Sequence, residues 1–116
     1  MLKSIQERLE ALPETLRTVT AEEARKELAE NKGALIDVRE PSELADSPVP
    51  ASYTIPRGVL EMKALDQFKN PDKPLYLHCA SGVRARLAGE QLIAMGYTNV
   101  TALISDIKDI QKAFNP

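Results

Sequence analysis

Apolar positions in this chain form two kinds of pattern that alternate from one end to the other. Short, mostly apolar runs predict strands, and those at 34–38 and 75–78 are apolar enough to be covered on both faces of a sheet. Shorter strands are expected at 16–19, 53–55 and 99–103. Between these runs, apolar residues recur at helical spacing. The predicted helices cover 2–12, 20–31, 42–46, 59–68, 84–95 and 106–114.

Local signals mark where several of these elements begin and end. Thr20 and Glu23 have the spacing of a capping box, in which each side chain binds the other residue's backbone N–H. Gly33 is expected to stop the helix that follows, and Pro13 to end the first helix. Helices that alternate with strands predict an α/β domain with a mostly parallel sheet of about four to five strands. In such domains, functional sites gather at the carboxyl ends of the strands.

Cys79, the only cysteine, lies at the end of the strand predicted at 75–78. It is followed by a loop of small residues and then by the start of a helix. The first N–H groups of a helix have no partner within the helix, and a loop of this kind can turn several N–H groups toward one point. Such a nest favours a thiolate, which is the reactive form of cysteine. The alternative is that Cys79 is a buried, inert cysteine. We favour the interpretation that it is reactive.

The segment around this cysteine resembles the active-site loop of the rhodanese sulfurtransferases. It reads Cys79, Ala80, Ser81, Gly82, Val83, Arg84. Further motifs in the same order resemble the family at 35–41, 49–56, 96–100 and 105–110. The chain departs from the family pattern at Pro48, where a His is usual, at Ala51, and at Ser105-Asp106, where two glycines are usual. The resemblance covers about 18–110, so we expect a rhodanese-like domain at 18–116 with an N-terminal helical extension at 1–17.

The resemblance implies a three-layer α/β fold and sulfur transfer by covalent catalysis. Cys79 would take a sulfane sulfur from a donor such as thiosulfate, and the resulting persulfide would pass it to cyanide or a thiol. The loop residues Ala80 to Arg84 would bind the persulfide and the anionic donor. Arg84 would orient the donor or pair with an acidic neighbour, and the two roles are equally favoured. Arg57 and Arg39 are weaker candidates for binding the donor.

Two neighbouring features are interpreted as structural. Asp37 and Arg39 follow a strand end, where such residues often bind each other. His78 should point to the opposite face of the sheet from Cys79. We therefore expect it to be packed or hydrogen-bonded rather than to act as a base.

Composition narrows the classes of function. The 116 residues form one domain, and a hydrophobic fraction of 43% is enough for a core. The net charge of −2 argues against nucleic acid as a partner. One cysteine and one histidine predict neither a disulfide nor a metal site, and no cofactor is expected. No apolar run has membrane-spanning length, and the N-terminus does not resemble a signal peptide, so we expect a cytoplasmic protein.

Two other functions stay open. The domain could act as a persulfide relay or binding module with a protein donor or acceptor of sulfur. The helix predicted at 2–12 could then serve as a docking or dimerisation arm, although simple packing on the domain is favoured. A Cys-dependent phosphatase or arsenate reductase ranks lower. Those enzymes have five residues between Cys and Arg in their active-site loop, whereas only four separate Cys79 from Arg84 here.

Overall fold

A computed structural model describes residues 1–116, and its centre is a five-stranded sheet in which every pair of neighbours is parallel. The strands follow the order β1-β5-β4-β2-β3. This confirms the predicted α/β class and the parallel sheet. The strands are β1 (Arg17–Val19), β2 (Ala34–Asp37), β3 (Tyr53–Thr54), β4 (Leu75–His78) and β5 (Val100–Leu103).

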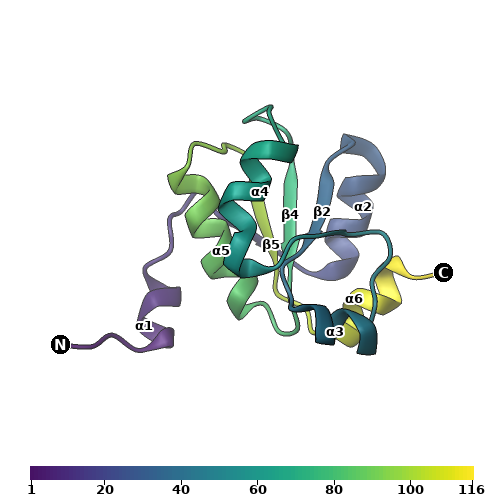
Figure 1. Cartoon of the computed structure of the whole chain (residues 1–116), viewed down its shortest axis with the longest axis horizontal. Helices are drawn as coiled ribbons and strands as arrows, with labels where there is room; N and C mark the ends of the chain where they lie inside the picture. The colour runs from purple at the N-terminus through teal and green to yellow at the C-terminus, as the bar shows by residue number, and fades with distance from the viewer.

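Helices cover both faces of this sheet, so the domain has three layers (Figure 1). One face packs against α4 and α5, with α1 outside α5, and the other against α2 and α6. The short helix α3 follows β2 near the carboxyl ends of the strands. The bounds are α1 (Ile5–Glu10), α2 (Ala21–Asn31), α3 (Pro41–Asp46), α4 (Leu60–Gln67), α5 (Val83–Ala94) and α6 (Ile107–Phe114), with a 3₁₀ turn η1 (Arg57–Val59) before α4.

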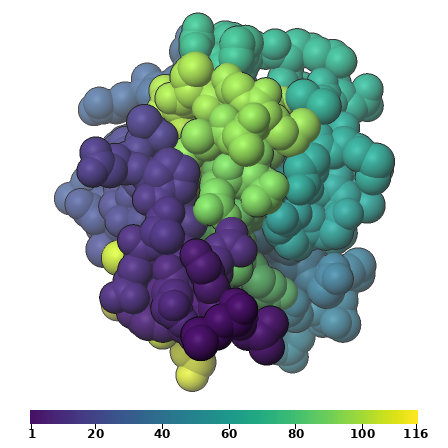
Figure 2. Space-filling view, turned by 90° about the vertical axis from the view of Figure 1, so that its left-hand side faces the viewer, coloured from purple at the N-terminus to yellow at the C-terminus, as the bar shows by residue number.

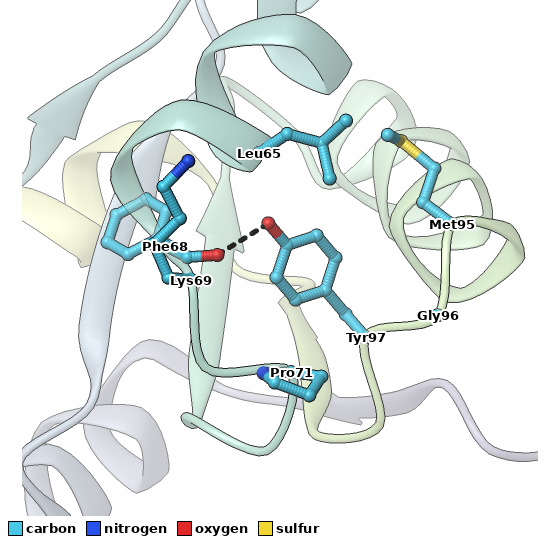
Figure 3. A pocket seen from close by; sticks show the side chains of 7 residues that line it. All are labelled: Leu65, Phe68, Lys69, Pro71, Met95, Gly96 and Tyr97. Carbon is cyan, nitrogen blue, oxygen red and sulfur yellow. Dashed lines mark hydrogen bonds between the residues drawn. The ribbon is translucent and has the colours of Figure 1, made fainter.

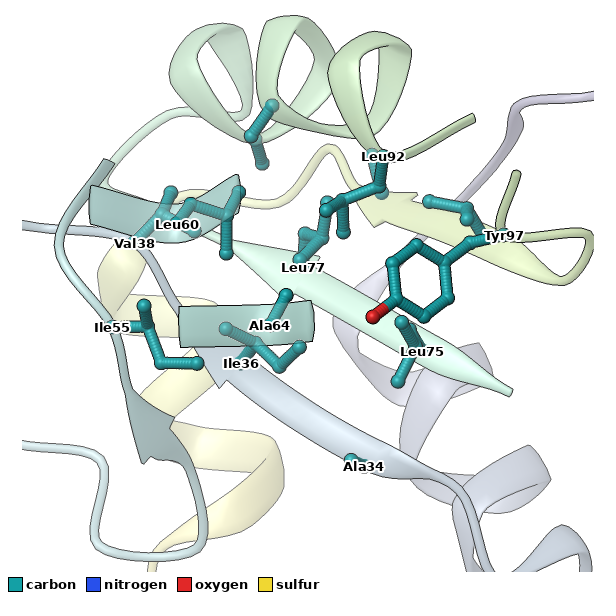
Figure 4. Close-up of a cluster of buried hydrophobic side chains, with 14 of the residues drawn as sticks. Ala34, Ile36, Val38, Ile55, Leu60, Ala64, Leu75, Leu77, Leu92 and Tyr97 are labelled. Atoms are coloured by element: carbon teal, nitrogen blue, oxygen red, sulfur yellow. The ribbon is translucent and has the colours of Figure 1, made fainter. Parts of the chain in front are cut away.

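The core consists of two apolar clusters, one on each face of the sheet. Successive strand residues point to opposite faces, so Leu75 and Leu77 join the cluster beneath α4 and α5, while Tyr76 joins the one beneath α2 and α6. Figure 4 shows the first cluster, in which Leu60 and Leu92 reach down from their helices onto the sheet. Cys79 belongs to this cluster as well. The three inner strands β2, β4 and β5 are buried throughout, as predicted for the apolar runs at 34–38 and 75–78, whereas the edge strands β1 and β3 are largely exposed.

Helix ends follow the sequence signals in part. Thr20 and Glu23 form the predicted capping box at the start of α2. The left-handed residue that closes α2 is Lys32, with a φ of 57°, and not Gly33. Gly33 has a different constraint, because a Cβ there would lie 2.6 Å from the carbonyl oxygen of Pro74. The first helix, predicted over 2–12, spans only Ile5–Glu10: Ser4 caps its start, and it ends at Ala11, before Pro13 is reached.

Two large apolar side chains in or directly next to these helices are exposed. Leu65 of α4 and Met95, directly after α5, both reach solvent. The buried residues of α5 are Ala85, Ala88, Gly89 and Leu92, and the first three are small enough to let the helix approach the sheet closely. None of the helices combines the length and the apolar character that crossing a membrane requires.

Candidate active site

The sulfur of Cys79 lies at the carboxyl end of β4, where the chain turns into α5. Its Sγ accepts hydrogen bonds from the backbone N–H of Gly82, at 3.1 Å, and of Ala85, at 3.4 Å. Both donors belong to the first turn of α5 or its N-cap, whose N–H groups have no partner within the helix. These N–H groups, together with the positive end of the helix dipole, stabilise negative charge on the sulfur.

The Cys79 loop, residues 79–84, is held in place by its backbone. Gly82 has a φ of 90°, and an added Cβ would lie 3.0 Å from Cα of Ile104. The carbonyl of Ala80 accepts a hydrogen bond of 2.9 Å from the N–H of Ile107, at the start of α6. The guanidinium of Arg86 donates to the carbonyl of Gly82 at 3.0 Å. The turn between β5 and α6 therefore fixes the loop from outside.

Cys79 is buried beneath this loop, with 1% of its surface exposed. None of the hollows in the surface is lined by Cys79. Of the loop residues, Ser81 is exposed, and Ala80, Val83 and Arg84 are half-buried. The sulfur therefore lies beneath the loop and lines none of the hollows in the surface.

Arg84 forms an ion pair with Glu43 of α3. Its two terminal nitrogens lie 2.7 and 2.8 Å from the two carboxylate oxygens of Glu43. This pair lowers the pKa of Glu43 to about 2 and raises the pKa of Arg84. Of the two predicted roles for Arg84, the structure shows pairing with an acid. The arginine links α3 to the start of α5 beside the Cys79 loop.

A second ion pair is buried beneath α3. The guanidinium of Arg39 binds the carboxylate of Asp37 through Nε at 3.0 Å and Nη2 at 2.8 Å, and both side chains are almost completely buried. Arg39 also donates to the side chain and carbonyl oxygens of Ser47, each within 2.8 Å. The predicted Asp37–Arg39 contact is confirmed. It anchors the segment after α3, so Arg39 is not available to bind a donor.

His78 is also buried at the end of β4, next to Cys79 in sequence. Its Nε2 lies 2.6 Å from Oγ of Ser52 and 3.8 Å from a carboxylate oxygen of Asp37, while its Nδ1 has no hydrogen-bond partner. Burial lowers the pKa of His78 to about 4, and Asp37 offsets only part of this effect. A neutral histidine bound to a serine on the far side of the strand agrees with the predicted structural role.

The remaining candidate, Arg57, lies in η1 and pairs with Glu61, one turn later, at 2.9 Å. It makes no hydrogen bond to the Cys79 loop.

Two residues of the site were missed from the sequence. The N–H of Ala85 could have been found from the free amides at a helix start, but Glu43 carries no local signal. No group of three or more His, Cys, Asp or Glu side chains is arranged to hold a metal ion.

Comparisons with known proteins agree with this geometry. The family model of the rhodanese-like domain matches residues 20–113. The chain is 40% identical over 80 residues to the mitochondrial thiosulfate sulfurtransferase RDL2 of Saccharomyces cerevisiae, covering 60% of this chain and 54% of the yeast protein. It therefore spans about half the length of that relative. It is also 35% identical to the uncharacterized protein YqhL of Bacillus subtilis, over 80% of this chain and 71% of YqhL.

One solved structure resembles the whole chain. It is a Rhodopseudomonas palustris protein described as of unknown function and a possible tyrosine phosphatase. The two share 25% sequence identity with a TM-score of 0.83, and the match covers 100% of this chain and 95% of the other. Yeast RDL2 itself has been solved, and it matches with a TM-score of 0.64 over 84% of this chain and 89% of the RDL2 chain.

Proposed function

Because the chain belongs to the rhodanese-like domain family, we propose that it is a sulfurtransferase that carries sulfur as a persulfide on Cys79. The observation that carries the proposal is the pair of N–H groups, from Gly82 and Ala85, directed at the Cys79 sulfur. A relative from Saccharomyces cerevisiae is named a thiosulfate sulfurtransferase and one from Schizosaccharomyces pombe a putative thiosulfate sulfurtransferase, which supports thiosulfate as the first donor to test.

The first half-reaction would load the cysteine. The Cys79 thiolate attacks the outer sulfur of thiosulfate, a new sulfur–sulfur bond forms, and the bond within thiosulfate breaks. Sulfite leaves with the bonding electron pair, and the protein holds a persulfide anion. The N–H groups at the start of α5 would stabilise this anion in the manner of an oxyanion hole. No oxidant is needed, because the sulfur moves with its oxidation state intact.

The second half-reaction would remove the outer sulfur from the Cys79 persulfide. Cyanide attacks the outer sulfur of the persulfide, the sulfur–sulfur bond breaks, and thiocyanate leaves while the Cys79 thiolate is restored. A thiol, of a small molecule or of a partner protein, could take the sulfur in the same way. The reaction needs a free thiol at the start of each cycle, which fits a reducing compartment such as the cytoplasm.

A phosphatase is the second candidate, because the Rhodopseudomonas palustris neighbour is described as a possible tyrosine phosphatase. The Cys79 loop argues against it. Gly82 packs against Ile104 and Leu103, and Ala80 is tied to α6, so the loop is held close around the sulfur. A tetrahedral phosphate needs a ring of donors wide enough for its oxygens, whereas the donors here converge on the sulfur atom itself.

Steady-state assays separate the two candidates. We expect thiocyanate to form from thiosulfate and cyanide, and we expect Cys79→Ser to abolish this activity. Ser42→Ala is the matched control, because Ser42 lies outside the Cys79 loop, on α3, and its side chain is exposed and makes no hydrogen bond. Hydrolysis of p-nitrophenyl phosphate that depends on Cys79, without any thiocyanate, would contradict the sulfurtransferase and favour the phosphatase.

A further inference from the structure

Ser105, in the turn between β5 and α6, makes a hydrogen bond that joins this turn to α2. Its hydroxyl oxygen accepts a hydrogen bond of 2.8 Å from the backbone N–H of Ala21. Ala21 is the first residue of α2 and is 2% exposed. An N–H at this position has no partner within the helix. Ser105 therefore supplies the acceptor that a buried donor requires.

The residues that follow Ser105 extend this connection to the Cys79 loop. Asp106 is the N-cap of α6. Ile107, the first residue of α6, donates its N–H to the carbonyl of Ala80 at 2.9 Å. Residues 105–107, which we call the α6 entry, therefore contact α2 on one side and the Cys79 loop on the other.

The contact with Ile107 fixes the peptide group between Ala80 and Ser81. No peptide bond in the chain is cis, so the C=O of Ala80 and the N–H of Ser81 point in opposite directions. The C=O points to α6, which packs on one face of the sheet. Cys79 packs on the other face, in the cluster beneath α4 and α5. The α6 entry thus turns the N–H of Ser81 toward the side on which the sulfur lies.

Other contacts hold α5 but do not reach this peptide group. N-terminal residues, purple in Figure 2, lie against α5, where Arg8 pairs with Glu90 at 2.7 Å. Beyond the far end of the helix, the hydroxyl of Tyr97 donates a hydrogen bond of 2.8 Å to the carbonyl of Phe68 (Figure 3). Neither contact involves a residue of the Cys79 loop. The orientation of the peptide group after Ala80 therefore depends on the α6 entry.

We propose that Ser105 is a positioning residue for the sulfur transfer proposed above. Its hydroxyl, bound to the N–H of Ala21, keeps the α6 entry in the place from which Ile107 orients the Cys79 loop. Without this hydroxyl, the N–H groups directed at the sulfur should move away from it and stabilise the thiolate less. The effect on turnover rests on the proposed function, whereas the effect on the thiolate does not depend on which donor supplies the sulfur.

A titration of Cys79 tests this role directly. The ultraviolet absorbance of the thiolate is followed in the folded protein across a pH series, with Cys79→Ser as the blank. In Ser105→Ala, the thiolate signal should appear about 0.5–1 pH unit higher than in the wild type, because the anion loses part of its hydrogen bonding. Thiocyanate formation should slow by about three- to tenfold. Ser105→Thr keeps the hydroxyl and should restore both values.

Two control variants separate positioning from a general loss of stability. Thr20→Ala removes the other side-chain acceptor at the start of α2, which binds the N–H of Glu23 at 3.2 Å. Tyr97→Phe removes the hydrogen bond to Phe68 beyond the far end of α5. Both should lower the free energy of unfolding in urea and leave the titration of the thiolate unchanged.

Ala21→Pro breaks the same hydrogen bond from the donor side, because proline lacks an N–H and is accepted at the first position of a helix. It should shift the titration in the same direction as Ser105→Ala. No shift in either variant, an equal shift in Thr20→Ala, or an unchanged rate of thiocyanate formation in Ser105→Ala would overturn the proposal. A wild-type chain that forms no thiocyanate would contradict the proposed function instead, and the titration would still decide whether Ser105 positions the loop around the thiolate.

Discussion

At the scale of single residues, Gly82 sets the position of the Cys79 sulfur. A side chain there is strained by the φ of 90° and would crowd Ile104. We predict that Gly82→Ala lowers the free energy of unfolding by about 1–3 kcal/mol and slows sulfur transfer, because the N–H must shift away from the sulfur. Urea unfolding measures the first effect. Gly58→Ala is the control, since nothing lies within 4 Å of its added Cβ, and equal losses in both variants would contradict the prediction.

His78 gives a second prediction, on pH. Burial lowers the pKa of His78 from 6.5 to about 4. Between pH 6.5 and 4, His78 is therefore protonated in the unfolded chain and neutral in the folded one. Stability should therefore fall as the pH drops from about 6.5 to 4.5, by about 2 kcal/mol. His78 is the only histidine, so it accounts for the loss in the upper part of this window. The carboxyls of Glu27 and Glu43, whose pKa is lowered from 4.5 to about 2, add to the loss only as the pH approaches 4.5.

Urea unfolding at a series of pH values tests this account. We expect most of the slope between pH 6.5 and 4.5 to disappear in His78→Gln, which keeps a polar side chain beside Ser52. An unchanged slope in this variant would assign the effect to other groups.

Individual residues of this kind are only partly predictable from the sequence. The reactive position of Cys79 follows from the strand, loop and helix around it, but the partner of His78, Ser52, comes from a loop without periodicity.

At the scale of elements, the ion pair between Arg84 and Glu43 connects α3 to α5 beside the Cys79 loop. Glu43→Gln frees the Arg84 guanidinium and removes a negative charge beside the Cys79 loop. We predict a KM for thiosulfate about two- to fivefold lower, equivalent to the modest energy of a partly exposed pair. Glu61→Gln, which breaks the comparable pair with Arg57, is the control and should leave KM unchanged. A higher KM in Glu43→Gln would mean that the intact pair positions the donor.

The elements themselves were the most predictable part of the structure. Their apolar runs and the Thr20–Glu23 capping box predicted the class and the location of each strand and helix, although the first helix is shorter than the predicted 2–12. The prediction for the turn after α2 was wrong in its detail. Lys32 takes the left-handed conformation, and Gly33 is required by the nearby carbonyl of Pro74. Contacts such as Glu43 with Arg84, 41 residues apart, depend on how α3 folds over the sheet, which no local pattern encodes.

At the scale of the whole molecule, the two apolar clusters share one sheet and should unfold together. Leu77 belongs to one cluster and Leu103 to the other, and both are completely buried. We predict that Leu77→Ala and Leu103→Ala each lower the free energy of unfolding by about 2–5 kcal/mol. In either variant, loss of helical circular dichroism and exposure of the Cys79 thiol should occur in one transition. Separate transitions would show that the two layers fold independently.

The central claim is that Cys79 carries sulfur as a persulfide. The most direct test is the intact mass of the reduced protein after thiosulfate, and again after cyanide. We predict a gain of one sulfur atom that cyanide removes and that Cys79→Ser abolishes. An unchanged mass, in protein that is folded and whose Cys79 is shown to be reduced by alkylation after unfolding, would contradict the account for thiosulfate as the donor.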